Sequence, residues 1–409
     1  MRKENPQSVG ISLVSDQNNA EPSRVRILIA TTVPETLATI LKNQFRYLAG
    51  HFQVVLATSP GNTFIQVEKN EGVVVHPVPM SRGISVLRDL VSLFRMARVL
   101  GRVKPRLVHS YTPKAGLVVM LAAWLCRVPV RVHTFTGLIF PTSHGFRRKL
   151  LIWVDRLICA CATHVVPEGR GVKTDLETFR ITRKPLHVIG YGNIAGVDTD
   201  YFSAAAPGIG EAALALRRGL LIRPEHFLFC FVGRLNRDKG LSELTQAFGL
   251  MPSTAHLLLV GGLDQTAPID AATLLAIESH PRIHQLGFLD DIRAALQAAD
   301  VLVLPSYREG FPNALLQAGS MGLPVIATDI NGCNEVIESG RNGWLVVPRD
   351  VGSLHAAMRQ ALDVPVSTRD EMGRQARAVV RQRFERQEHW ERMLKFYQEL
   401  LYSDQKVKE

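Results

Sequence analysis

Residues 227–240 read FLFCFVGRLNRDKG, and the order of strand, loop and helix that begins there recurs along the whole chain. The first six residues are apolar, which predicts a buried β-strand, and the polar residues after them precede a helical pattern. Gly233 permits a tight turn after the strand, and Arg234 and Lys239 place two positive charges near the beginning of the helix. Such a loop is suited to binding a diphosphate, although the spacing alone is equally compatible with solvated loop charges.

A second strand end carries the sequence PSYREGFPNALLQAG, residues 305–319. Glu309 lies in its Gly/Pro-rich loop, where a carboxylate can accept hydrogen bonds from sugar hydroxyls, and Gln317 follows about two helical turns further along the same side. A single glutamate in a loop is more often a cap or turn residue. Together with Arg234 and Lys239, however, Glu309 forms a specific constellation.

Short β-rich runs alternate with longer helical patterns, which predicts parallel sheets with helices on both faces. The first series of predicted strands covers 25–30, 52–57, 73–78, 107–110, 130–134 and 165–167. The second series covers 227–232, 256–260, 283–286, 301–304, 324–327 and 344–347. We therefore predict an α/β fold with two doubly wound, Rossmann-like domains in tandem.

The length of 409 residues also favours two domains, because a single hydrophobic core stops growing below that size. We predict a flexible polar tail at 1–23, an N-terminal domain at 24–205 and a C-terminal domain at 206–380. A C-terminal helix and tail at 381–409 is expected to pack back on the N-terminal domain. Open α/β sheets bind ligands beyond the carboxyl ends of their strands, so the functional site is expected in the cleft between the domains.

The formal net charge of +11 at pH 7 favours an anionic partner. Basic residues gather between Arg82 and Arg106 around an apolar helical pattern. This segment is compatible with a helix on a membrane surface, and equally with the basic outer face of a helix that packs on a sheet. No nucleic acid is expected as a partner, because neither a recognition motif nor interleaved aromatic residues accompany the basic residues.

Five cysteines without a C-x-x-C pair predict neither a disulfide framework nor a zinc site, which fits a reducing cytoplasm. The N-terminus has no basic end followed by an unbroken apolar run, so no signal peptide is expected. The longest apolar stretch, 116–126, falls short of the roughly 20 residues that a membrane-spanning helix needs. Any contact with a membrane is therefore expected to be peripheral.

Several stretches resemble, in the family's order, the motifs of the retaining GT-B glycosyltransferases of family 4. In the C-terminal half these are FVGRLNRDKG (231–240), LGFLDDI (286–292), ADVLVLPSYREGFPNALLQA (299–318) and GLPVIATDINGCNEVI (322–337). Upstream, VHSYTPKAGL (108–117), HTFTGL (133–138) and GNIAGVDTDYF (192–202) resemble the branch that builds O-antigen, capsule and other polyprenyl-linked glycans.

The resemblance implies that Arg234 and Lys239 hold the donor diphosphate and neutralise the leaving group. Glu309 would contact the donor sugar and complete the catalytic set. No metal ion and no cofactor other than the nucleotide-sugar substrate is then expected. The remaining donor-binding positions that the resemblance implies are Gly233, Gly310, Phe311, Pro312, Asn313 and Gln317.

Two positions depart from the family's pattern. The family usually has a second glutamate where this chain has Gln317, which still accepts a hydrogen bond but carries no charge. Many relatives have a histidine near the anomeric carbon where this chain has Thr136, which indicates a variant site. His109, Lys114, His133 and Thr136 are the positions expected to orient acceptor or donor, and for the two histidines a structural role is at least as compatible.

These implications predict a retaining glycosyltransferase that moves a hexosyl or N-acetylhexosaminyl group to a polyprenyl-diphosphate-linked or other glycan acceptor in surface polysaccharide synthesis. A UDP-sugar is expected as donor in preference to a GDP-sugar. The protein is expected to be cytoplasmic and peripheral, on the anionic inner face of the plasma membrane. Two alternatives stay open: a nucleotide-sugar epimerase of GT-B fold, and a non-catalytic partner protein that binds a nucleotide-sugar.

Overall fold

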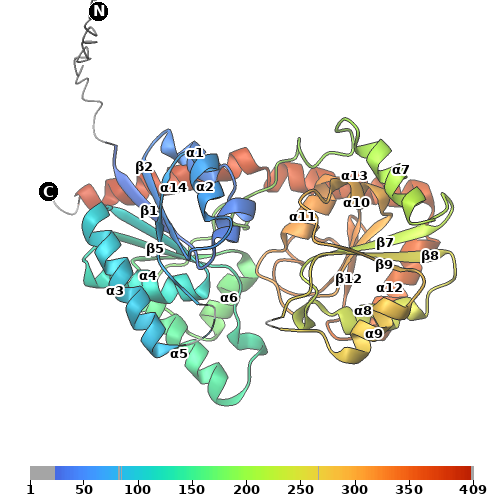
Figure 1. The fold of residues 1–409 in the computed structure, drawn as a ribbon, viewed down its shortest axis with the longest axis horizontal. Helices are drawn as coiled ribbons and strands as arrows, with labels where there is room; N and C mark the ends of the chain where they lie inside the picture. Colours follow the sequence, from blue (N-terminus) through green and yellow to red (C-terminus); the bar gives the residue numbers. More distant parts are fainter. Residues whose placement is uncertain (1–23, 82, 84, 266, 407–409) are drawn as a thin grey trace, which may run out of the picture.

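The computed structural model describes residues 24–81, 83, 85–265 and 267–406, and the tail predicted at 1–23 lies outside them. In this part of the chain two parallel sheets each carry helices on both faces (Figure 1). We call the part with strands β1 to β6 the N-terminal lobe and the part with strands β7 to β12 the C-terminal lobe. The predicted pair of doubly wound sheets is confirmed.

The first sheet has six parallel strands within the described residues. In order across the sheet they are β3 (Val74–Pro77), β2 (Gln53–Thr58), β1 (Arg26–Ala30), β4 (Leu107–Tyr111), β5 (Val130–Phe135) and β6 (His164–Pro167). The helices and helical turns of this lobe are η1 (Thr36–Ile40), α1 (Gln44–Ala49), α2 (Phe64–Glu71), α3 (Val86–Val103), α4 (Pro113–Leu125), η2 (Phe140–Thr142), α5 (Gly145–Cys161) and α6 (Arg170–Thr178).

The second sheet repeats this arrangement. Its strands, in order across the sheet, are β12 (Gly343–Val346), β11 (Val325–Thr328), β10 (Val301–Leu304), β7 (Phe227–Val232), β8 (Ala255–Val260) and β9 (Ile283–Gly287). The helices that follow the first lobe are α7 (Ile209–Gly219), η3 (Arg237–Lys239), α8 (Leu241–Gly249), α9 (Ala271–Ser279), α10 (Arg293–Ala298), α11 (Asn313–Ser320), α12 (Val351–Asp363), α13 (Val366–Arg383) and α14 (Arg386–Lys406).

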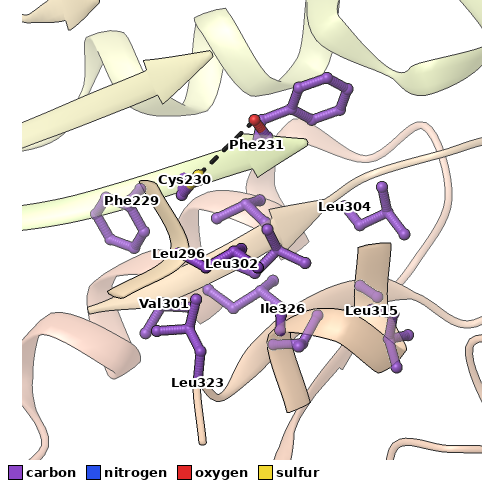
Figure 2. Packing of buried hydrophobic residues seen from close by; sticks show 14 of the residues in the cluster. Phe229, Cys230, Phe231, Leu296, Val301, Leu302, Leu304, Leu315, Leu323 and Ile326 are labelled. Atoms are coloured by element: carbon purple, nitrogen blue, oxygen red, sulfur yellow. Dashed lines mark hydrogen bonds between the residues drawn. The ribbon is translucent and has the colours of Figure 1, made fainter. Parts of the chain in front are cut away.

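Every predicted strand corresponds to an observed strand, and the ends differ by at most one residue. The signal is strong because central parallel strands are buried on both faces and therefore read as continuous apolar runs. In β1, Ile27 and Ile29 pack in one core while Leu28 and Ala30 pack in another, on the opposite face of the sheet. Figure 2 shows the corresponding core of the C-terminal lobe, with Phe229 and Leu302 from neighbouring strands.

Helix α14 leaves the C-terminal lobe and packs on the first sheet, as predicted for the C-terminal helix (Figure 1). Its residues Met393, Tyr397 and Leu401 belong to the core on the β1 face that contains Ile27. An ion pair of 2.7 Å joins Arg106 to Asp404 near the end of the helix. The chain therefore crosses between the lobes a second time, which ties the C-terminal segment to the beginning of the fold.

Candidate functional site

Two adjoining cavities, of about 460 and 400 Å³, lie between the lobes. Residues of both lobes line each cavity, and several residues line both. The lining comes from loops at the carboxyl ends of the strands, where a doubly wound sheet is expected to bind its ligand. We call the larger space the first cavity and the smaller one the second cavity.

The loop from β7 to α8 brings its two positive charges into this cleft. Arg234 and Lys239 line both cavities, and Gly233 lines the second. The loop packs so closely against the end of β10 that a side chain at Gly240 would overlap the carbonyl oxygen of Pro305. Gly240 also has φ +68°, a conformation that favours glycine. Glycine at position 240 therefore lets the loop from β7 to α8 approach the loop that follows β10.

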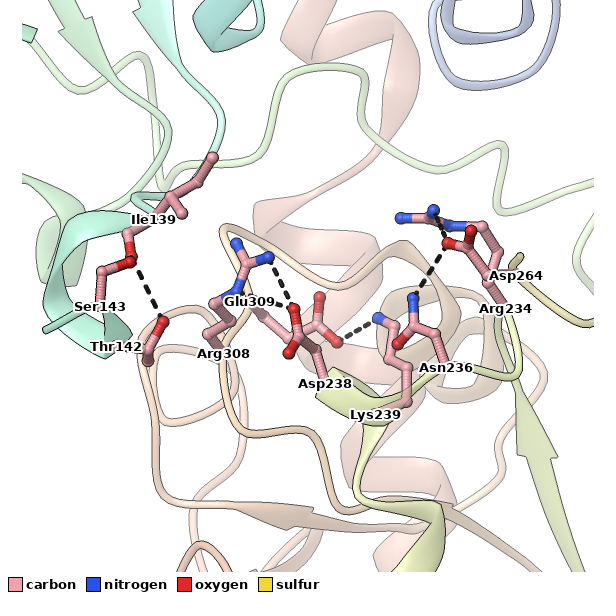
Figure 3. Close-up of polar contacts among 10 residues, drawn as sticks. All are labelled: Ile139, Thr142, Ser143, Arg234, Asn236, Asp238, Lys239, Asp264, Arg308 and Glu309. Atoms are coloured by element: carbon pink, nitrogen blue, oxygen red, sulfur yellow. Dashed lines mark hydrogen bonds and ion pairs between the residues drawn. The ribbon is translucent and has the colours of Figure 1, made fainter. Parts of the chain in front are cut away.

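Lys239 and Glu309 form the central contact of the site (Figure 3). The Lys239 Nζ lies 2.5 Å from the Glu309 Oε1, and both side chains are largely buried. Arg234 is paired with Asp264, while its side chain stays 60% exposed toward the cleft. The loop from β7 to α8 thus contributes one buried cation beside a carboxylate and one exposed cation to the cleft, an arrangement suited to an anion with a neighbouring hydroxyl-bearing group.

The loop from β10 to α11 forms the floor of the second cavity. Gly310, Phe311, Pro312 and Asn313 all line it, and helix α11 begins at Asn313. Backbone N–H groups at a helix N-terminus have no partner within the helix and favour negatively charged oxygens. Gln317 lies further along the same helix, half-buried and outside the lining of both cavities.

The N-terminal lobe supplies the opposite wall. Thr136 follows β5 and lines both cavities, and Lys114 lines the first cavity. The Lys114 Nζ donates hydrogen bonds of 2.8 and 2.7 Å to the two carboxylate oxygens of Asp89 in α3. Lys114 is therefore held at the cleft by an ion pair with the outer helix.

The two histidines lie inside the lobe and do not line the cavities. His109 is hydrogen-bonded through Nδ1 to the Tyr397 hydroxyl at 2.6 Å and through Nε2 to Thr134 at 2.7 Å. His133 is hydrogen-bonded to Ser110 at 2.8 Å. Burial lowers the pKa of His109 well below its usual value and that of His133 to about 3, so both rings are neutral at pH 7. Their observed contacts are those of structural histidines.

Glu168 lies at the site although the sequence analysis did not single it out. It follows β6 directly, is 6% exposed and lines the second cavity. Its position one residue after a predicted strand was a usable signal, because carboxyl ends of strands collect at the ligand edge of the sheet. Burial, together with the neighbouring Glu309 and Glu335, raises the pKa of Glu168 well above its usual value.

Contacts between the lobes lie close to Glu168. Glu335 of the C-terminal lobe accepts hydrogen bonds of 2.6 and 3.0 Å from the backbone N–H groups of Arg170 and Gly171, at the beginning of α6. Asn331 donates to Asp175 at 2.7 Å. These contacts hold the lobes together on one side of the cleft. Among the residues that the structure describes, no group of three or more His, Cys, Asp or Glu side chains is placed to bind a metal ion.

The two lobes match two different models of known protein families. Residues 226–363 match the family model described as "Glycosyl transferases group 1", and residues 37–192 match the "Glycosyl transferase 4-like domain". The capsular polysaccharide biosynthesis glycosyltransferase CapM of Staphylococcus aureus is 27% identical over 92% of this chain and 97% of its own length. An Escherichia coli UDP-Gal:α-D-GlcNAc-diphosphoundecaprenol α-1,3-galactosyltransferase is 30% identical over 69% of this chain and 73% of its own.

Among solved structures, Anabaena Alr3699/HepE in complex with UDP and glucose superposes with a TM-score of 0.77. The superposition covers 92% of this chain and 100% of that chain, at 19% identity. This similarity establishes a common GT-B fold.

Proposed function

We propose, because the chain belongs to the group 1 glycosyltransferases of family 4, that it transfers a sugar from a UDP-sugar to a glycan linked to a polyprenyl diphosphate. As a member of this family it is a retaining glycosyltransferase that uses a nucleotide-sugar. The observation that carries the proposal is the cluster of Arg234, Lys239 and Glu309 where the two cavities meet. The Escherichia coli relative, named for UDP-galactose and an undecaprenol-linked acceptor, supports the choice of both substrates.

The cluster matches the charges that develop during transfer. Cleavage of a sugar–phosphate bond leaves positive charge on the sugar ring and negative charge on the departing diphosphate. Lys239, Arg234 and the N–H groups at the beginning of α11 stabilise the diphosphate, while Glu309 accepts a hydrogen bond from the sugar. The acceptor oxygen attacks the anomeric carbon from the face that the diphosphate leaves, and the acceptor proton passes to the diphosphate. This geometry accounts for retention.

A surface of the N-terminal lobe supports a membrane-bound acceptor. The apolar helical pattern of α3 faces outward: Leu87 is 79% and Phe94 69% exposed, while Ser92, Met96 and Leu100 face the core. We call the exposed apolar residues of α3, α4 and α5 the apolar face; they are Val86, Leu87, Leu90, Val91, Phe94, Trp124, Leu125, Phe146 and Trp153. Helices α3 and α5 also carry exposed basic residues, namely Arg88, Arg95, Arg98, Arg102, Arg147, Lys149 and Arg156.

Apolar side chains beside basic ones are typical of a protein surface that inserts into anionic lipid headgroups. No helix of the described residues is long and apolar enough to cross a bilayer. We therefore propose peripheral binding to the inner face of the plasma membrane through the apolar face, which places the cleft close to a lipid-linked acceptor.

The double variant Leu87→Ser, Phe94→Ser is expected to bind vesicles of phosphatidylcholine and phosphatidylglycerol about tenfold or more weakly, because two exposed apolar side chains no longer insert. Cosedimentation with the vesicles measures this effect. The matched control is Leu275→Ser, Phe288→Ser, which removes a similarly exposed pair from the C-terminal lobe. Equal binding by both double variants, or no binding by the wild-type protein, would contradict the membrane proposal.

A donor screen tests the transferase proposal directly. The purified protein is incubated with a synthetic undecaprenyl-diphosphate N-acetylglucosamine and each common UDP- or GDP-sugar, and the mass of the lipid product is measured. We expect a gain of one sugar from a UDP-sugar, with the anomeric configuration of the donor retained in the product. No gain with any donor, despite measurable binding of UDP, would refute the proposed acceptor, and an inverted product would refute the mechanism.

A further inference from the structure

The carboxyl group of Glu168, in the N-terminal lobe, lines the second cavity and has no role in the mechanism above. Glu168 is fixed through its backbone: its N–H donates to the carbonyl oxygen of Phe135 at 3.1 Å, and its carbonyl oxygen accepts from the N–H of Asn193 at 2.8 Å. Its side chain reaches Gly310, where a Cβ would overlap the Glu168 Oε2. The absence of a side chain at Gly310 therefore leaves room for this carboxyl group beside the floor of the cavity.

The carboxyl groups of Glu168, Glu309 and Glu335 lie close together, and those of Glu309 and Glu335 have partners. Glu309 is paired with Lys239, and Glu335 accepts from two backbone N–H groups of α6. Within the described part of the chain, the carboxyl group of Glu168 makes neither a hydrogen bond nor an ion pair with another residue. A buried carboxylate without a partner is costly, particularly near two other carboxylates, and both effects favour the protonated form of Glu168.

A protonated carboxyl group has an O–H that can donate a hydrogen bond, which a carboxylate cannot do. A sugar hydroxyl both donates and accepts, so a donor on one wall and an acceptor on the other wall match its chemistry. Glu309 supplies the acceptor from the C-terminal lobe. Glu168 supplies the donor from the N-terminal lobe.

We infer that Glu168 binds the donor sugar directly, by donating a hydrogen bond from its neutral carboxyl group to a hydroxyl of the sugar in the second cavity. The inference rests on the proposed function, which places the sugar of the UDP-sugar beside Glu309. It adds a substrate-binding residue from the N-terminal lobe that the sequence motifs did not indicate, opposite the donor-binding positions of the C-terminal lobe.

The variants Glu168→Gln and Glu168→Ala test this role, because glutamine keeps a donor of similar shape and alanine removes it. We expect kcat/KM for the UDP-sugar found in the donor screen to fall about tenfold or more in Glu168→Ala and to stay within about threefold of wild type in Glu168→Gln. Calorimetry with UDP and UDP-galactose separates the sugar contact from the nucleotide contact. Glu168→Ala should weaken binding of UDP-galactose while leaving binding of UDP unchanged.

The pH dependence supplies a second readout. The charged groups that line the second cavity with Glu168 are Glu309, Lys239 and Arg234, and Glu335 lies close to Glu168 outside that lining. Because the pKa of Glu168 is raised, its O–H donor is present below that raised pKa and is lost as the pH rises through it. The ratio of wild-type to Glu168→Gln activity should therefore fall with rising pH, since glutamine does not titrate.

Several results would overturn the inference. If Glu168→Gln were as inactive as Glu168→Ala, the ionised form would be the one required. If Glu168→Ala were fully active, or bound UDP and UDP-galactose equally weakly, Glu168 would not contact the sugar. A wild-type protein that bound UDP-galactose but transferred no sugar would refute the proposed function instead, and the binding comparison would still decide the role of Glu168.

Discussion

Replacement of Lys239 by alanine is expected to lower kcat/KM for sugar transfer by about 100- to 1,000-fold, the effect of removing one fixed group that stabilises developing negative charge. The side chain of Lys239 is only 20% exposed and lies 2.5 Å from Glu309, so its charge acts in a largely desolvated site. The substitution also leaves the Glu309 carboxylate, 12% exposed, without its cation. Steady-state transfer to the lipid acceptor measures the loss.

The matched control for this prediction is Arg237→Ala. Arg237 lies in the same helical turn, η3, but is exposed and lines neither cavity. Its replacement removes an equal charge from the loop and should leave kcat/KM within about twofold of wild type, as expected for a solvated surface charge. If the two variants lost activity equally, the loop would act through its overall charge and not through a cation placed under the diphosphate.

Replacement of Gly310 by alanine is expected to reduce transfer by about 100-fold or more, because a displacement of about 1 Å in a catalytic site has an effect of that size. The added Cβ would overlap the Glu168 Oε2 and would lie 2.7 Å from the backbone nitrogen of Gly137, both in the opposite lobe. The φ angle of Gly310 is outside the left-handed region, so the backbone itself tolerates alanine. The substitution should therefore hold the lobes further apart without disturbing the folding of the C-terminal lobe.

Gly262→Ala is the control, because a Cβ there meets no atom within 4 Å. Both variants should unfold at a temperature close to that of the wild type. Only Gly310→Ala should lose transfer, and small-angle scattering should show a larger radius of gyration as the lobes separate. Full activity of Gly310→Ala would mean that sugar transfer does not require the lobes to approach each other as closely as they do in the structure.

The amino-acid sequence was sufficient to predict both sheets. Most strands are short, largely apolar runs between polar loops, and this signal depends only on residues next to one another in the chain. The same holds for the loops at strand ends, which carry Arg234, Lys239 and Glu309, since the carboxyl ends of parallel strands must meet at one edge. The assignment of catalytic and binding roles to these residues stays a prediction, as do the domain boundaries.

Spacing did not reveal which side chains would be buried or which residues of the two lobes would meet. His109 lies against Tyr397 of α14, whereas His133 lies on the opposite face of the sheet beside Gly116 of α4. The apolar pattern of α3 faces outward, because packing partners distant in the chain cover one face of an element and leave another open. Glu168 acquires its significance only when Gly310, from the other lobe, is brought against it. Local patterns specify elements and their ends, whereas burial, pairing and protonation depend on contacts that exist only after the two lobes have closed on each other.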